Sequence, residues 1–220
     1  MNARQRRIAL LVLLAVVPLV LPFVLPRFVL VQIVIKTLWL GTVAASLTFL
    51  ARYGGMVSLA QTAIYGTAGY ATALLTVKQG WNPWLAAGVA IGVAVAVSLL
   101  IGLISARSRD IYFLMLTLAC AVFIYYFASQ SPALGSHGGI NGTPPPVLGS
   151  ISFNDPRNFY FLALGVAVAS AVLLRLYART SLGLGLEGSR DCPERMESIG
   201  FNGSFVRVLG FVMAGVIAAF

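Results

Sequence analysis

The chain has 220 residues, of which 59% are hydrophobic and only 10% are charged. A soluble domain of this size has too little interior to bury so much apolar surface, so the composition excludes a soluble globular protein and predicts a membrane protein. The net charge of +9 does not indicate nucleic-acid binding, because the lysines and arginines punctuate hydrophobic runs instead of clustering on one soluble face.

Transmembrane helices are the predicted elements, since about 20 apolar residues span the hydrocarbon core of a bilayer. The first apolar run has the basic start of a signal peptide, but it lacks a small-residue cleavage site and contains three prolines, so we interpret it as a retained span. The spans are predicted near residues 8–26, 28–51, 56–77, 84–106, 111–128, 158–177 and 204–220. The sequence therefore predicts an all-α, polytopic transmembrane helix bundle of about seven spans, forming a single domain over residues 1–220.

The span at 56–77 carries more polar and small residues than the others. Small residues let helix backbones approach closely, and polar side chains cannot cheaply face acyl chains, so we expect this helix at the centre of the bundle. One interpretation is a packing seam of Thr62, Gly66, Gly69 and Ala73. The other, compatible with the first, is a translocation path lined by Gln61, Thr62, Tyr65 and Tyr70, with Gln61 and Tyr65 on one helix face. A break or hinge is expected at Gly54 and Gly55 or at Gly66 and Gly69.

The same segment could cross the membrane or dip in and return, and the positive-inside rule distinguishes the two topologies. Crossing puts all of the 15 basic residues on or near the cytoplasmic side except Arg27, Lys36, Lys78 and Arg157. A re-entrant segment leaves only Arg4, Arg6, Arg7, Arg52, Lys78 and Arg157 there. We therefore predict that the segment crosses, and that the N-terminus and residues 178–203 are cytoplasmic.

The segment from Ala128 to Asn158 is predicted to be a long external loop with glycines, a triple proline and the single histidine, His137. A loop of this length is usually functional or disordered, and docking of a partner is the hypothesis we draw. The two cysteines, Cys120 and Cys192, supply neither a disulfide framework nor metal-ligand spacing. We expect no metal, no cofactor and no redox chemistry.

The stretch LEGSRDCPERMESIGFNG, residues 186–203, holds four of the six acidic residues of the chain. Pro193 is suited to the first position of a helix and Gly200 to the residue after its end. Between them an apolar stripe is predicted from Cys192, Met196 and Ile199, while the charged side chains of Glu194, Arg195 and Glu197 face elsewhere. So short a helix needs a protein packed against its stripe. The alternative is a solvated loop.

The last predicted span, FVRVLGFVMAGVIAAF, stops at Phe220 with no polar residue after it. A helix that ended in hydrocarbon would leave its last carbonyls and its carboxylate unsatisfied. We therefore expect the chain to be truncated at its C-terminus, with more helices downstream.

Four stretches resemble the permease subunits of branched-chain amino acid ABC importers. YGGMVSLAQTAIYGTAGYATALL (53–75) resembles the glycine-rich signature of that family. RSRDIYFLMLTLA (107–119) and GSHGGINGTPPP (135–146) resemble its basic loop and its external loop, and RTSLGLGLEGSRDCPERMESIGFNGSFVRVLGFVMAG (179–215) resembles its cytoplasmic loop and following helix. Arg195 and Met196 stand where that pattern has two alanines, and Asp110 replaces a usual glycine. Members usually run longer, which agrees with truncation.

This resemblance implies a bacterial inner-membrane subunit, in contact with membrane lipid, that pairs with a second permease subunit, two cytoplasmic ATPase subunits and a periplasmic binding protein. Its substrates would be branched-chain or similar small amino acids, although urea or short amides would fit a path without charge equally well. It also implies that the cytoplasmic helix couples to the ATPases through Cys192, Glu194, Arg195, Met196, Glu197, Ile199 and Gly200. Independently, the chain has no P-loop pattern, so we expect ATP hydrolysis on separate subunits and no enzyme activity here.

Two other classes of function compete with this one. A stand-alone secondary transporter or channel needs ionisable residues inside the membrane for ion coupling, and apart from Lys36 the predicted spans offer almost none. A membrane enzyme needs His, Asp, Glu or Cys side chains clustered around a cavity, which one loop histidine does not provide.

Overall fold

The computed structural model describes residues 18–105, 107–108, 110–134, 139–140, 142, 147–148, 151–153, 155–200 and 202–220. Helices dominate, which confirms the predicted all-α bundle. A continuous helix is formed by α2 (Arg27–Val29), the π-helical η1 (Leu30–Ile35) and α3 (Lys36–Gly54). It is followed by α4 (Gln61–Ala73), which runs on into the π-helical η2 (Leu74–Lys78), and by α5 (Pro83–Ser105) and α6 (Asp110–Gln130). The later helices are α7 (Pro156–Ala178), α8 (Ser181–Asp191), α9 (Pro193–Ser198) and α10 (Gly203–Ala219).

The segment between α6 and α7 contains a 3₁₀ turn and a pair of short strands. A 3₁₀ turn, η3 (Pro132–Leu134), follows α6, and the strands β1 (Val147–Leu148) and β2 (Ile151–Ser152) form an antiparallel pair in which Val147 lies opposite Ser152. His137 falls outside the described residues, so docking of a partner at this loop stays a prediction.

The number of seven spans is not confirmed. In the described part of the chain, four helices are long and apolar enough to cross a membrane, namely Arg27–Gly54, Pro83–Ser105, Ile111–Gln130 and Pro156–Ala178. Of the first predicted span, residues 8–17 lie outside the described residues. The span predicted at 56–77 becomes helical only at Gln61, and the last one is the shorter apolar helix α10.

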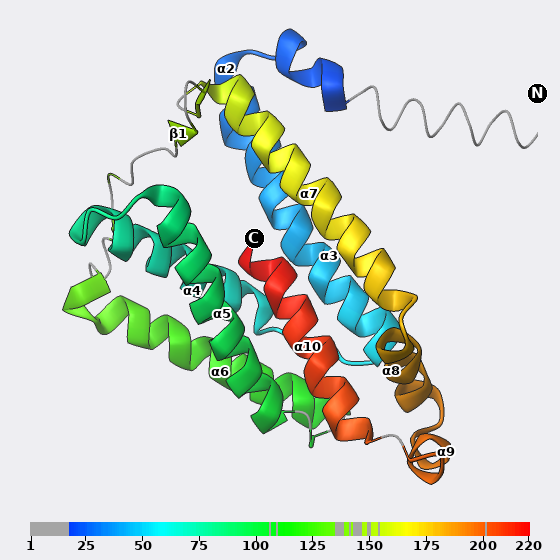
Figure 1. Ribbon diagram of the computed structural model, residues 1–220. Coiled ribbons are helices and arrows are strands. Elements are labelled where there is room, and N and C mark those ends of the chain that lie inside the picture. Colours follow the sequence, from blue (N-terminus) through cyan, green and yellow to red (C-terminus); the bar gives the residue numbers. More distant parts are fainter. Residues whose placement is uncertain are drawn as a thin grey trace, which may run out of the picture.

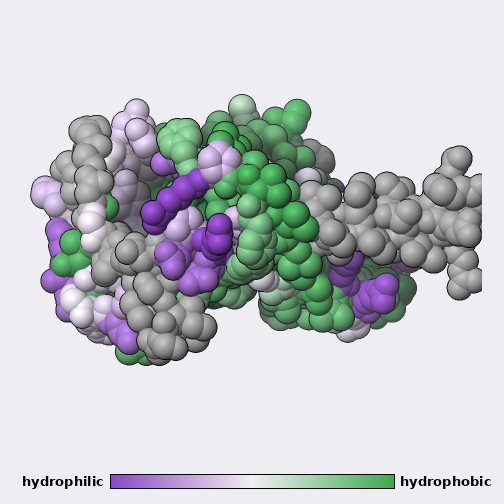
Figure 2. Space-filling model, turned by 90° about the horizontal axis from the view of Figure 1, so that it is seen from above, coloured by the Kyte–Doolittle hydropathy of each residue, from purple (hydrophilic) through white to green (hydrophobic). Residues whose placement is uncertain are grey.

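The helices form two groups that diverge toward one end of the molecule (Figure 1). α3 and α7 pack side by side in one group, and α4, α5 and α6 form the other. α10 lies between the groups and packs against α3, α4 and α5, while α8 and α9 lie at the end where the groups meet. Hydrophobic side chains cover large continuous parts of the surface seen from above (Figure 2), as expected for a surface in contact with acyl chains.

Small side chains explain the close packing of α5 with its neighbours. The buried face of this helix repeats at every fourth residue, with Ala86, Ala90, Ala94 and Ser98. Such a stripe lets helix backbones approach closely in a membrane protein. At the contact with α10, a Cβ atom added to Gly215 would collide with the Ser98 side chain. A separate apolar cluster joins the continuous helix Arg27–Gly54 to α7. It includes Leu30, Ile35, Tyr160 and Ala163.

Replacing Gly215 with alanine should destabilise the protein by about 1–3 kcal/mol, because the added methyl group overpacks the contact between α10 and α5. Gly92 is the matched control, since it also lies in a long apolar helix but a Cβ there would meet nothing within 4 Å. Thermal unfolding in detergent measures both variants. Equal unfolding temperatures for Gly215→Ala and Gly92→Ala would contradict this packing.

Candidate translocation path and coupling helices

The chain breaks between α3 and α4, inside the segment predicted to be one span. Gly55 adopts a left-handed conformation with φ of 62°, and its N–H and that of Met56 both donate to the Leu50 carbonyl. Residues 55–60 are not helical, yet Met56, Ser58 and Ala60 are buried. Irregular backbone at membrane depth is tolerated only where protein covers it. The structure therefore has the break at the first of the two predicted glycine pairs, while Gly66 and Gly69 lie within the continuous α4.

One hydrogen bond and a cation hold this irregular segment against its neighbours, and a second hydrogen bond forms within the segment. The Leu59 N–H donates to Thr117 Oγ1 of α6 over 3.3 Å, and the Ala60 N–H donates to Ser58 Oγ over 3.2 Å. From α10, Arg207 approaches Met56 Sδ with its Nε atom at 3.2 Å and donates from Nη2 to the Ser108 carbonyl at 3.0 Å. The break is thus tied to α6, to α10 and to the turn between α5 and α6.

Gln61, the first residue of α4, is completely buried. Neither its Oε1 nor its Nε2 atom has a hydrogen-bond partner among the described residues. A buried polar group without a partner costs about 1–3 kcal/mol. Native proteins rarely retain such a group without a reason, so Gln61 stands out as a candidate for function.

The other three predicted path residues do not converge on one site. Tyr65 is 39% exposed and lines a cavity of about 800 Å³ between α3 and α7 on one side and α4 and α5 on the other. Thr62 and Tyr70 line a second cavity, of about 670 Å³, between α4, α5 and α6. Gln61 and Tyr65 were predicted to act on one face, but the first is enclosed by packed helices and the second lies in a cavity.

Two residues of the predicted small-residue seam, Gly66 and Gly69, make no close contact with another helix among the described residues. A Cβ atom added to Gly66 or Gly69 would meet nothing within 4 Å, and these two glycines line the second and the first cavity, respectively. The buried face of α4 is instead made by Gln61, Ile64 and Ala68. The glycines of α4 therefore widen the two cavities.

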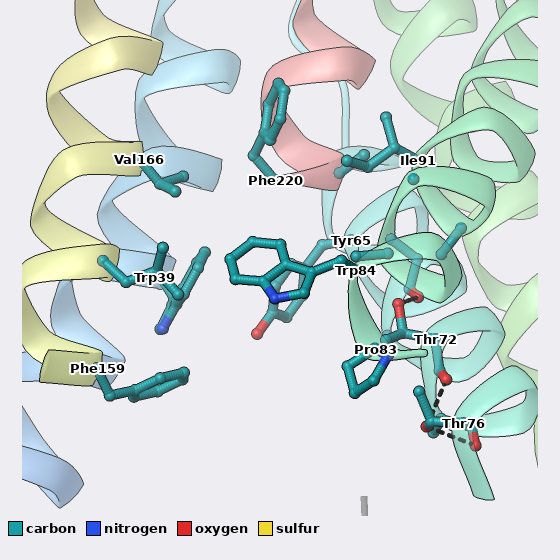
Figure 3. A pocket seen from close by; sticks show the side chains of 18 residues that line it. Trp39, Tyr65, Thr72, Thr76, Pro83, Trp84, Ile91, Phe159, Val166 and Phe220 are labelled. Atoms are coloured by element: carbon teal, nitrogen blue, oxygen red, sulfur yellow. Dashed lines mark hydrogen bonds between the residues drawn. The ribbon is translucent and has the colours of Figure 1, made fainter. Parts of the chain in front are cut away.

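The cavity beside Tyr65, which we call the central cavity, has aromatic walls (Figure 3). Trp39 of α3 and Phe159 of α7 pack against each other with ring centroids 6.4 Å apart, and Trp84 of α5 lies across the opening from them. On α4, the Thr72 hydroxyl donates to the Ala68 carbonyl at 2.9 Å and the Thr76 hydroxyl donates to the Thr72 carbonyl at 2.8 Å. Their oxygens can still accept hydrogen bonds from a solute.

None of the described residues that line the central cavity is charged. Such a site can hold a small solute by its apolar part while a few hydroxyl groups fix its orientation. Its described side chains supply no charge with which to select a cation or an anion. The arrangement suits a solute that is neutral overall and carries an aliphatic group.

At the opposite end of the bundle, the stretch predicted as a loop with one short helix contains two helices. α8 begins after Thr180, whose hydroxyl oxygen accepts a hydrogen bond from the Gly183 N–H at 3.3 Å. α9 runs over Pro193–Ser198 and is followed by Gly200 with φ of 92°, as the positions of Pro193 and Gly200 predicted. Here sequence reasoning missed α8, although Thr180 is a recognisable N-cap residue.

The predicted apolar stripe of α9 does not form one buried surface within the chain. Cys192 is exposed, and Ile199 is 66% exposed. Met196 packs against α8, where a Cβ atom at Gly188 would lie 2.7 Å from its Sδ atom. Glu194, Arg195 and Glu197 are exposed. Of the stripe, Cys192 and Ile199 are left free to meet another protein.

The sequence over residues 29–220 matches the family of the permease component of the branched-chain amino acid transport system. The chain belongs to this family. It is therefore a membrane-embedded transport component, and the resemblance noted in its motifs is confirmed. No curated protein and no solved structure matches the chain.

The structure gives a physical reason for the methionine at position 196. The resemblance led us to expect an alanine there, and the longer side chain needs space between α9 and α8. Gly188 supplies that space, since its missing Cβ leaves room for the Met196 thioether. For Arg195, which is exposed, the structure offers no comparable explanation.

Proposed function

We propose that this chain is the transmembrane permease subunit of an ATP-driven ABC importer for branched-chain or similar small amino acids. Its partners would be a second permease subunit, two cytoplasmic ATPase subunits and a periplasmic binding protein, in the bacterial inner membrane. The N-terminus and residues 178–203 would lie in the cytoplasm. The observation that carries this proposal is the polar helix α4, which begins at a buried break and borders an uncharged, aromatic-walled cavity in a chain of this family.

The substrate path follows α4 in this proposal. Tyr65 and the threonines of α4 would meet the solute in the central cavity, and Gln61 lies four residues closer to the end with α8 and α9. The unpaired Gln61 amide would gain its hydrogen-bond partner from the substrate or from water when the helices around it separate. Thr62 and Tyr70 border the second cavity and would assist from the other face of α4. Apolar walls favour an aliphatic amino acid over urea or a short amide.

Coupling to ATP hydrolysis would pass through α8 and α9. Ile199 is the larger of the two exposed side chains of the predicted stripe, and the exposed charges of Glu194, Arg195 and Glu197 would form a polar rim around it. An apolar anchor within a charged rim is typical of a docking surface, in which the charges fix orientation more than affinity. Gly200 ends the helix and turns the chain toward α10.

Replacing Ile199 with aspartate should weaken retention of the ATPase subunits by about ten-fold or more, because a charge would replace the apolar anchor. Ile199→Leu, which keeps an apolar side chain of equal size, is the control and should bind normally. Co-purification of the ATPase subunits with the tagged permease in detergent measures retention. Met196→Asp is unsuitable as the first test, since Met196 packs within the chain. Equal retention by Ile199→Asp and Ile199→Leu would overturn this docking surface.

A further inference from the structure

One apolar side chain of α8, that of Leu186, inserts at the break between α3 and α4. Leu186 is completely buried. A Cβ atom added to Gly54, the last residue of α3, would lie 3.5 Å from Leu186 Cδ1, and one added to Gly210 of α10 would lie 2.7 Å from Cδ2. The two glycines thus form a socket for Leu186. A leucine held this closely moves with both helices that enclose it.

Arg190, one turn farther along α8, reaches the same place with its charge. Its Nη1 atom donates to the Arg52 carbonyl in the last turn of α3. Carbonyls in that turn have no partner within their own helix, and the helix dipole favours a cation there. The stem of Arg190 lies against Gly55, where a Cβ atom would come 2.6 Å from Cγ. Gly55 is therefore required both for its left-handed backbone and for this close approach.

Two acidic side chains orient the guanidinium group of Arg190. Its Nε atom donates to Asp191 Oδ1 at 2.7 Å, and its Nη2 atom lies 3.9 Å from Glu187 Oε1. The hydrogen bond from Arg190 lowers the pKa of Asp191, so this carboxylate stays ionised through the neutral range. With Nε directed to Asp191, Nη1 is left facing the end of α3.

We infer that Leu186 and Arg190 are positioning residues that carry movement of α8 and α9 directly to the break between α3 and α4. The source of the movement rests on the proposed function, in which ATPase subunits pull on α9. The break is the place where such a movement turns α4, because residues 55–60 are not helical and the chain can bend there. From there the movement reaches Gln61, and through Gly210 it reaches α10.

The first test needs only this chain, reconstituted in nanodiscs. One nitroxide label is placed at Glu197→Cys on α9 and another at Val77→Cys in η2, the continuation of α4, in a background where Cys120 and Cys192 are alanine. Pulsed electron spin resonance then reports the distance between the two labels. We expect Arg190→Gln to broaden or shift the distance distribution. Arg190→Lys, which keeps the charge and the stem, should restore part of the narrow distribution. Arg195→Gln on α9 is the matched control and should leave it unchanged. An unchanged distribution for Arg190→Gln overturns the inference.

The second test uses the assembled transporter. Arg190→Gln should retain the ATPase subunits and hydrolyse ATP, but should import about ten-fold less substrate per ATP. The reason is that the substitution removes the charged donor of the hydrogen bond to the Arg52 carbonyl, and such bonds are stronger than neutral ones. A merely structural role would reduce retention, hydrolysis and import together, and that result overturns the inference, as does normal import. If the unmodified chain fails to bind ATPase subunits, the proposed function fails, and the label distances alone decide the role of Arg190.

Discussion

Replacing Gln61 with leucine should raise the stability of the permease and abolish transport. Leucine has a volume similar to that of glutamine and needs no hydrogen bond, so the substitution removes the cost of a buried amide whose two polar atoms have no partner among the described residues. The expected gain is about 1–3 kcal/mol in the free energy of unfolding. Transport should fall to background, because the amide would no longer be present to meet substrate or water when the path opens.

Gln130 provides the matched control for this substitution. It is exposed at the end of α6, so Gln130→Leu changes the same groups without removing a buried, unpaired amide. Thermal unfolding in detergent and substrate uptake in proteoliposomes should be measured on both variants. A Gln61→Leu protein that is more stable and still transports would remove Gln61 from the path. One that is less stable would mean that the amide is bonded in the native protein.

Leu186→Ala should destabilise the protein by about 2–5 kcal/mol, the range for truncating a buried leucine. Leu186 fills the socket between α3 and α10, so its loss leaves a cavity at the break and detaches α8. Leu184 lies two residues away on the same helix and is 60% exposed. Leu184→Ala should therefore change the stability by no more than about 0.5 kcal/mol.

The pair is compared by thermal unfolding of the purified chain in detergent, and by the rate at which a protease cuts within residues 178–203. Detachment of α8 should expose that stretch in Leu186→Ala but not in Leu184→Ala. Equal effects of the two substitutions on unfolding and on cleavage would show that α8 is not seated at the break.

Short sequence patterns predicted those features that depend on the backbone conformation of single residues. Pro193 and Gly200 predicted both ends of α9, since one fixes φ and the other allows a left-handed conformation. The break was predicted at either of two glycine pairs, and it occurs at Gly54 and Gly55, where Gly55 adopts the left-handed conformation. α8 was missed because its glycines are poor helix formers, and its stability comes from packing against α3, α7 and α10, which no local pattern reveals.

The central cavity depends on contacts between distant parts of the chain. Trp39, Trp84 and Phe159 come from three helices, and no spacing in the sequence relates them. The helix period correctly put Gln61 and Tyr65 on neighbouring positions of α4. It did not reveal that packed helices enclose Gln61 while Tyr65 lines the cavity between the two helix groups. The helices packed around α4 determine how deeply each residue on one of its faces is buried. Residue spacing alone therefore could not distinguish Gln61 from Tyr65.

Uptake by the complete transporter tests the central proposal most directly. The permease, its second permease subunit, the ATPase subunits and the binding protein would be reconstituted in proteoliposomes with radiolabelled leucine. The proposal predicts accumulation that requires ATP and the binding protein, that excess unlabelled isoleucine or valine suppresses, and that urea does not. Leucine uptake by this chain alone, driven by an ion gradient and indifferent to ATP, would contradict it.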